Sequence, residues 1–203
     1  MFNIIFLIFL SFFTLLLIYI TTKKNFLLSY TGEFHQTFAT SEKIPLIGGI
    51  IICLSFCYLF FDYSNLVLIT LISFTFLGII SDIKSNFSPN LRLIIQSILI
   101  ILFVIISDLK ITNTRILFLD QLLSYSIFNY FFVSFCLLIL INGTNFIDGL
   151  NTNVVGYYLI ISFFIAKYSV YENLGLSHLS WNFWMMSLLI VYFFNFFKKL
   201  FLG

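Results

Sequence analysis

Hydrophobic residues along this chain gather in seven long blocks, and short polar stretches separate them. Each block approaches the ~20 residues that an α-helix needs to cross the hydrocarbon of a bilayer. The blocks cover residues 2–21, 44–61, 66–81, 91–107, 126–142, 153–168 and 183–198. The pattern predicts an all-α fold, a polytopic transmembrane helical bundle of about seven spans. The sequence shows no internal repeat or linker, so we expect one integral membrane domain over residues 1–203.

The composition supports a bilayer as the natural solvent. The chain is 61% hydrophobic and 9% charged, with a mean hydropathy of +1.10. Soluble domains carry about 25% charged residues, which they need to cover their core. A net charge of +2 gives no reason to expect a nucleic acid as partner.

Lys and Arg are unevenly divided between alternate connections. Seven of the ten lie in or beside the stretches 22–43, 82–90 and 143–152 or in the C-terminal tail, and three lie on the other side. Basic residues favour the cytoplasmic side of a membrane. We therefore expect a protein of the cytoplasmic (inner) membrane, with these three connections in the cytoplasm and the N-terminus outside.

The third of these connections carries the asparagine motif, residues 142–150. Asn142, Asn145 and Asp148 are spaced i, i+3 and i+6, so they share one face of a helix. A carboxylate and two carboxamides on one face at a membrane edge suit a metal or a phosphate. The alternative is an ordinary helix end, with Asp148 and Gly149 in a turn and the asparagines bonding between helices.

The lysine–glycine motif, residues 43–50, lies at the end of the first cytoplasmic connection. In a structural interpretation, Pro45 occupies the first turn of a helix, Gly48 and Gly49 permit close helix packing, and Lys43 anchors at the headgroups. In a functional interpretation, the glycines let the backbone approach a phosphate, and Lys43 supplies a positive charge.

The aspartate motif runs from Gly78 to Gln96. Its Asp82 falls at the C-terminal end of a helix, where the helix dipole disfavours a negative charge; a carboxylate at such a depth is therefore a functional candidate. Ser88 as N-cap and Pro89 as first helical residue explain the start of the next helix. Arg92, with Gln96 at i+4, either faces the same site as Asp82 or anchors at the headgroups.

In order and spacing, the three motifs resemble the polyprenyl-phosphate N-acetylhexosamine-1-phosphate transferases of glycosyltransferase family 4. These are relatives of the phospho-N-acetylmuramoyl-pentapeptide transferase. Residues 45–49 match the family's Pro-x-x-Gly-Gly, and residues 78–96 are similar to its Gly-x-x-Asp-Asp region ending in Gln. Residues 142–150 match Asn-x-x-Asn-x-x-Asp-Gly-Leu without a gap.

The resemblance implies transfer of a sugar-1-phosphate, with N-acetylhexosamine as the expected sugar, from a UDP-sugar to polyprenyl (undecaprenyl) phosphate. UMP is released, and the product serves cell-envelope polysaccharide biosynthesis. The implied cofactor is Mg²⁺ or Mn²⁺, and oligomerisation is left open. The residues it implicates are Asp82 and Asp148 as catalytic and metal-binding groups, and Lys43, Arg92, Asn142 and Asn145 as substrate-binding groups.

The chain departs from the family pattern in two motifs and at its end. Ser81 stands where the family has the first Asp of a pair, and Asn151 replaces a further acidic residue. The sequence stops at Gly203, where the family continues into Gly-Asp-x-Gly-Ser and further spans. We therefore expect a fragment or a C-terminally shortened member of the family that shows little transfer by itself. Two alternatives are a catalytically impaired homologue with a non-enzymatic role and a small transporter, although polar residues at the ends of the spans disfavour transport.

Overall fold

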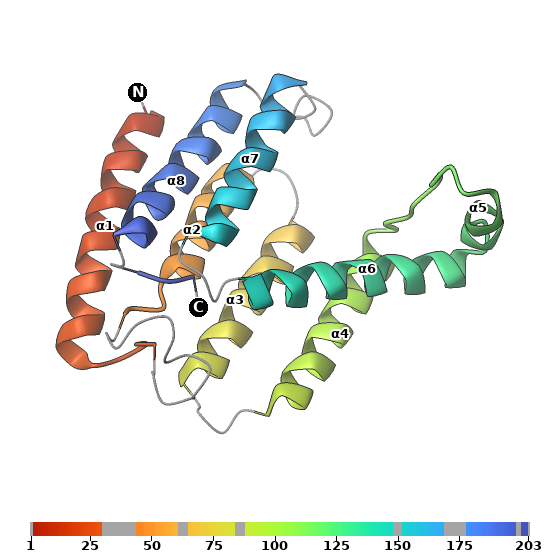
Figure 1. Ribbon diagram of the computed structural model, residues 1–203, viewed down its shortest axis with the longest axis horizontal. Helices are drawn as coiled ribbons and strands as arrows, with labels where there is room; N and C mark the ends of the chain where they lie inside the picture. The colour runs from red at the N-terminus through yellow and green to blue at the C-terminus, as the bar shows by residue number, and fades with distance from the viewer. Residues whose placement is uncertain are drawn as a thin grey trace. The chain divides into compact units, whose positions relative to one another are not determined.

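A computed structural model describes residues 2–29, 44–60, 65–83, 88–147, 152–168, 178–197 and 200–202. Within these residues the secondary structure is α-helical apart from isolated β-bridges. The helices shown in Figure 1 are α1 Phe2–Lys24, α2 Gly48–Phe60, α3 Asn65–Ile83, α4 Pro89–Ile106, α5 Leu117–Leu123, α6 Ser126–Ile147, α7 Asn153–Lys167 and α8 His178–Phe196.

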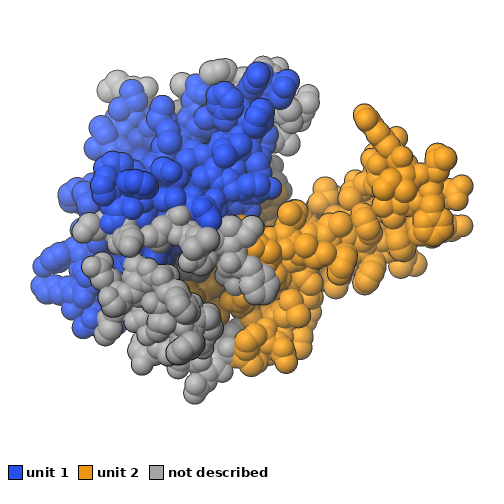
Figure 2. Space-filling view, viewed as in Figure 1, with its two compact units in different colours: residues 1–63, 147–203 blue, residues 64–146 orange. Residues whose placement is uncertain are grey.

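The chain divides into two compact units, coloured separately in Figure 2. Unit 1 combines residues 1–63 with residues 147–203, and unit 2 is formed by residues 64–146. The two ends of the chain therefore share a unit. The aspartate motif and the helical part of the asparagine motif up to residue 146 belong to unit 2.

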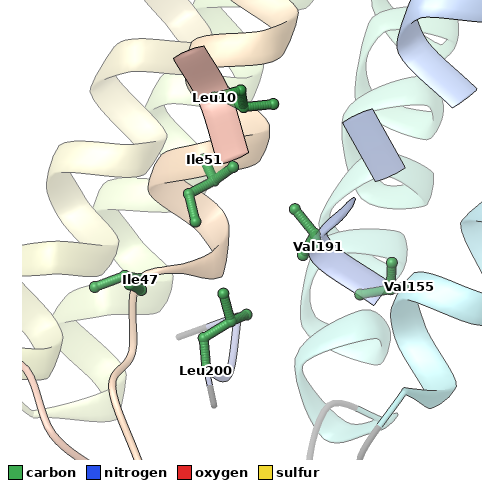
Figure 3. Packing of buried hydrophobic residues seen from close by; sticks show 6 residues of the cluster. All are labelled: Leu10, Ile47, Ile51, Val155, Val191 and Leu200. Atoms are coloured by element: carbon green, nitrogen blue, oxygen red, sulfur yellow. The ribbon is translucent and has the colours of Figure 1, made fainter. Parts of the chain in front are cut away.

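Helix α8 is the centre of unit 1, where it packs against α7, α2 and α1. Apolar side chains from these helices and from the segments beside them meet in one cluster (Figure 3). Its buried members are Leu10, Ile47, Ile51, Val155, Val191 and Leu200. Because lipid is as apolar as a leucine side chain, close van der Waals packing and hydrogen bonds hold such helices together.

Hydrogen bonds join α8 to α7 at Ser162. The indole N–H of Trp181 donates to the Ser162 carbonyl at 3.0 Å, and that of Trp184 donates to the Ser162 hydroxyl at 3.3 Å. Trp181 is buried, so its N–H needs an internal partner. One serine thus fixes the register of the two helices.

Unit 2 is built from α3, α4 and α6. Its core cluster contains Ile100 and Val104 of α4 and Val133 of α6. Phe74 of α3 and Ile111, which follows α4, pack against this cluster. Large apolar side chains also cover the outer faces of these helices, for example Phe76 at 63% exposure and Ile106 at 64%. Surfaces of this kind suit contact with lipid.

The helices confirm the predicted fold class, since one lies at each of the seven apolar blocks. Helices α1, α3, α4 and α6 are long and apolar enough to cross a membrane. Helices α2 and α7, with 13 and 15 residues, are apolar but shorter. The seven-residue helix α5 was not predicted.

The prediction that Pro45 lies in the first turn of a helix is wrong. Helix α2 begins three residues later, at Gly48. Pro45 instead forms a β-bridge with Leu28, and Leu46 forms one with Phe201. Backbone pairing with two remote segments therefore holds this stretch extended.

Candidate functional site

The end of α3 and the start of α4 bring two charges of the aspartate motif together. Asp82 is half-buried in the last turn of α3. Arg92 lies in the first turn of α4, close enough for its guanidinium to interact electrostatically with the Asp82 carboxylate. The structure thus places these two charged groups within electrostatic range of each other at the point where two candidate spans adjoin.

The start of α4 is set by its cap, as the sequence predicts. Ser88 has extended backbone angles, and its hydroxyl oxygen accepts the backbone N–H of Leu91 at 3.2 Å. Pro89 follows as the first helical residue, where no N–H is required. This cap fixes the helical position of Arg92, three residues further along.

Gln96 lies one turn beyond Arg92 and is buried, at 8% exposure. Its Oε1 accepts no hydrogen bond from the residues that the structure describes. Buried polar atoms are nearly always paired, and an unpaired one costs about 1–3 kcal/mol. The carboxamide oxygen is therefore an unpaired buried acceptor within the described part of the chain.

In the asparagine motif, α6 continues through residues 142–147. The Asn142 side-chain N–H donates to the Leu138 carbonyl at 2.9 Å. Helix α6 includes Asn145 in its backbone, but the side chain of Asn145 lies outside the described residues, as do Asp148 and Lys43. Within the described part of the chain, no hydrogen bond or ion pair joins Asn142 to Asp82 or Arg92.

Two glycines of these motifs have open space around them. A Cβ atom built at Gly78 or Gly143 meets no other atom within 4 Å. Packing among the described residues therefore does not require glycine at either position. Both positions leave room for a further group beside the polar residues of the same helix.

The donors at these helix ends fit a hard divalent cation in chemical type. Carboxylate and carboxamide oxygens are ligands that Mg²⁺ accepts, and it is commonly held by one or two carboxylates together with substrate phosphates. Over the described ranges, no group of three or more His, Cys, Asp or Glu residues lies close enough to hold a metal. Asp82 is the carboxylate available there.

In the lysine–glycine motif, the structure corrects the functional interpretation of the glycines. The backbone N–H groups of Gly48 and Gly49 donate to the carbonyls of Phe201 and Leu202, each at 2.8 Å. A Cβ at Gly48 would lie 2.8 Å from the Phe201 oxygen. The glycines therefore admit the backbone of residues 200–202, whose carbonyls occupy the N–H groups of Gly48 and Gly49 in place of a phosphate.

Asn195 is a structural residue that the sequence analysis did not select. It is buried, at 3% exposure. Its side-chain N–H donates to the Leu200 carbonyl at 2.9 Å, and its Oδ1 accepts the backbone N–H of Thr152. Thr152 has a positive φ of 67°, so this bond holds an unusual backbone conformation at the start of α7. The available signal was a lone carboxamide within the aromatic run 192–197.

Comparison with known proteins gives one match. The family described as glycosyl transferase family 4 matches residues 64–203. This range contains the aspartate and asparagine motifs and excludes the lysine–glycine motif. No curated protein and no solved structure matches the chain.

Proposed function

Because this chain belongs to glycosyl transferase family 4, we propose that it transfers a sugar-1-phosphate from a UDP-sugar to polyprenyl phosphate. The expected sugar is an N-acetylhexosamine, the expected lipid is undecaprenyl phosphate, and the product enters cell-envelope polysaccharide synthesis. The observation that carries the proposal is the proximity of Asp82 and Arg92, within electrostatic range of each other, inside the matched range.

The reaction is a phosphoryl transfer. An oxygen of the lipid phosphate attacks the phosphorus that carries the sugar, and the bond from that phosphorus to the bridging oxygen breaks. UMP leaves with the electron pair, and a lipid diphosphate sugar remains. Such a reaction requires mainly that two polyanions be positioned and their charge neutralised.

In this proposal Arg92 and Lys43 attract phosphate, and Asn142 and Asn145 orient the diphosphate. Asp82 and Asp148 hold Mg²⁺, which when bound neutralises phosphate charge. The order of the motifs along the sequence supports these roles, and so does the oxygen-donor chemistry at the ends of α3 and α6.

The first test is UMP release by the purified protein in detergent, with Mg²⁺, UDP-N-acetylhexosamine and undecaprenyl phosphate. We expect weak release by the parent chain, as the substitution at Ser81 predicts, and at least tenfold less by Asp148→Asn and Asp82→Asn. Asp120→Asn, remote in sequence from the three motifs, is the matched control and should leave release unchanged. Equal release by parent and Asp148→Asn proteins would remove Asp148 from the mechanism.

Ser81 supports the second candidate, a catalytically impaired homologue, because a hydroxyl cannot supply the charge of the family's first Asp. Ser81 is half-buried beside Asp82. If the lost charge limits activity, Ser81→Asp should raise Mg²⁺-dependent UMP release. Ser81→Asn, whose side chain has the shape of Asp but no charge, should not. No release by either variant, with UDP-sugar binding retained, favours the non-enzymatic role.

A further inference from the structure

Helix α5 and its flanks expose a dense set of large apolar side chains. We define the α5 patch as five residues that are 58–86% exposed: Ile116, Leu117, Phe118, Tyr125 and Ile127. The opposite side of the helix is anchored, since Leu123 is buried. This short helix therefore has apolar side chains on both its inner and its outer surface.

Side-chain hydrogen bonds fix α5 against the first turns of α6. The Asn129 carboxamide accepts the Ile111 N–H at 3.0 Å and donates to the carbonyls of Ile111 and Leu123, each at 2.8 Å. Asp120 accepts the Thr114 N–H at 2.7 Å and the Thr114 hydroxyl at 2.6 Å. The α5 patch is thus held on a braced segment.

The α5 patch continues the apolar surface of a candidate span. Ile127 lies on the same face of α6 as Phe131 and Phe135, at i, i+4 and i+8, and these two are 68% and 51% exposed. Helix α6 is apolar enough to cross a membrane. Figure 1 shows α5 at the end of α6 where that helix begins. One apolar surface therefore runs from a lipid-facing helix onto α5.

The charges near the α5 patch are arranged as in a membrane interface. Lys110 is already engaged, with its amine 2.7 Å from Asp108 and 5.1 Å from the centre of the Tyr130 ring. Arg115 is exposed beside Ile116 and forms no ion pair with another described residue. Interfacial segments combine an unpaired cation, a tyrosine and an apolar face in this way.

From this continuity and charge pattern, we propose that the α5 patch is a lipid-binding surface. It inserts at the boundary between headgroups and acyl chains, in the leaflet next to the start of α6, and Arg115 binds a lipid phosphate there. With the orientation expected from the Lys and Arg distribution, this is the outer leaflet. The proposal is independent of the proposed transferase activity.

The test uses an environment-sensitive nitrobenzoxadiazole label in vesicles of phosphatidylcholine and phosphatidylglycerol. In a background of Cys53→Ala, Cys57→Ala and Cys136→Ala, the label is placed by Phe118→Cys. The control is Thr112→Cys, an exposed polar position outside the patch, in the connection that precedes α5. Leu117→Cys is a second patch position, in case a label at residue 118 disturbs the helix.

We expect lipids with a nitroxide near the headgroup to quench labels at 117 and 118 at least threefold more than the label at 112. Aqueous iodide should show the reverse order. Equal iodide quenching at all three positions would place the α5 patch in water. Protection at 117 and 118 from both quenchers would mean that protein covers it; either result would overturn the proposal.

The role of Arg115 is tested separately, with the label at 118. Adding phosphatidylglycerol should increase headgroup-nitroxide quenching in the parent chain and have at most half that effect in Arg115→Gln. An equal increase in both proteins would overturn the assignment of Arg115 as the phosphate-binding residue.

Discussion

At the scale of single residues, Asn195 shows how one buried side chain joins segments that are remote in sequence. Its carboxamide bonds Thr152 at the start of α7 and Leu200 in the C-terminal segment. Thr152 lies two residues after the asparagine motif along the chain. The same side chain therefore supports the exit of a predicted catalytic loop and the segment that caps α2.

We predict that Asn195→Ala lowers the thermal unfolding midpoint in detergent. The change removes the hydrogen bonds to the half-buried Thr152 N–H and to the buried Leu200 carbonyl, and an unpaired buried group costs roughly 1–3 kcal/mol. Asn153→Ala, at an exposed position beside Thr152, is the control and should have little effect. Equal midpoints for the two variants would show that the Asn195 bonds contribute no net stability.

Asp120 gives a prediction on pH dependence. The Thr114 hydroxyl and N–H bond its carboxylate and hold the pKa of Asp120 below its usual value. Because its pKa is lower in the folded state, the ionised Asp120 carboxylate stabilises the fold at pH values above its unfolded-state pKa of about 3.9. This stabilisation is lost as the pH falls through the folded-state pKa. Protection of 111–123 from hydrogen exchange, corrected for intrinsic rates, should therefore drop below about pH 4. Asp120→Asn should remove this pH-dependent loss of protection. An equal loss in the variant would contradict the role of Asp120 in stabilising the segment.

At the scale of secondary-structure elements, the N-terminus of α2 has an unusual cap. Its first N–H groups donate to carbonyls of residues 201 and 202, instead of to a side chain close in sequence. Such a cap requires glycine, because any side chain at Gly48 would meet the backbone of the capping segment.

This geometry predicts opposite effects of alanine at two helical glycines. Gly48→Ala places a Cβ 2.8 Å from the Phe201 oxygen and should destabilise unit 1. Gly78→Ala meets no atom within 4 Å and should stabilise α3 by about 0.5–1 kcal/mol through helix propensity. Thermal unfolding of the two variants in detergent measures the difference. If Gly78→Ala lowered the unfolding midpoint as much as Gly48→Ala, the packing argument would be refuted.

The sequence predicted those elements whose cause is local. The structure has a helix at each place where an apolar block predicted one, and Ser88 and Pro89 predicted the start of α4. The extended conformation of residues 44–47 was missed because its partners include residues 200–202, which no local pattern connects to Pro45. Helix α5 was missed because it has seven residues and is braced by Asn129 from the next helix. Within the candidate site, Asp82 and Arg92 lie within electrostatic range of each other, while their roles and the position of Asp148 stay predictions.

At the scale of the whole molecule, orientation in the membrane is the main prediction still to be tested. It depends on the seven-to-three distribution of Lys and Arg. A cysteine introduced by Asn151→Cys should react with an impermeant maleimide only after cells are opened, whereas one introduced by Asn113→Cys should react in sealed cells. The three native cysteines are replaced by alanine in both proteins. Labelling of Asn151→Cys in sealed cells would reverse the topology.

The pairing of α2 with residues 200–202 also has a consequence for biosynthesis. Helices α1 and α2 are synthesised first, yet the carbonyls that complete the N-terminus of α2 follow about 150 residues later, or roughly 8–30 s at ~5–20 residues per second. Helix α8, the common neighbour of α1 and α2, also comes late. The early helices must therefore remain in the bilayer with unfilled contacts until α8 and residues 200–202 have been synthesised, and during that interval they are exposed to chaperones and membrane proteases.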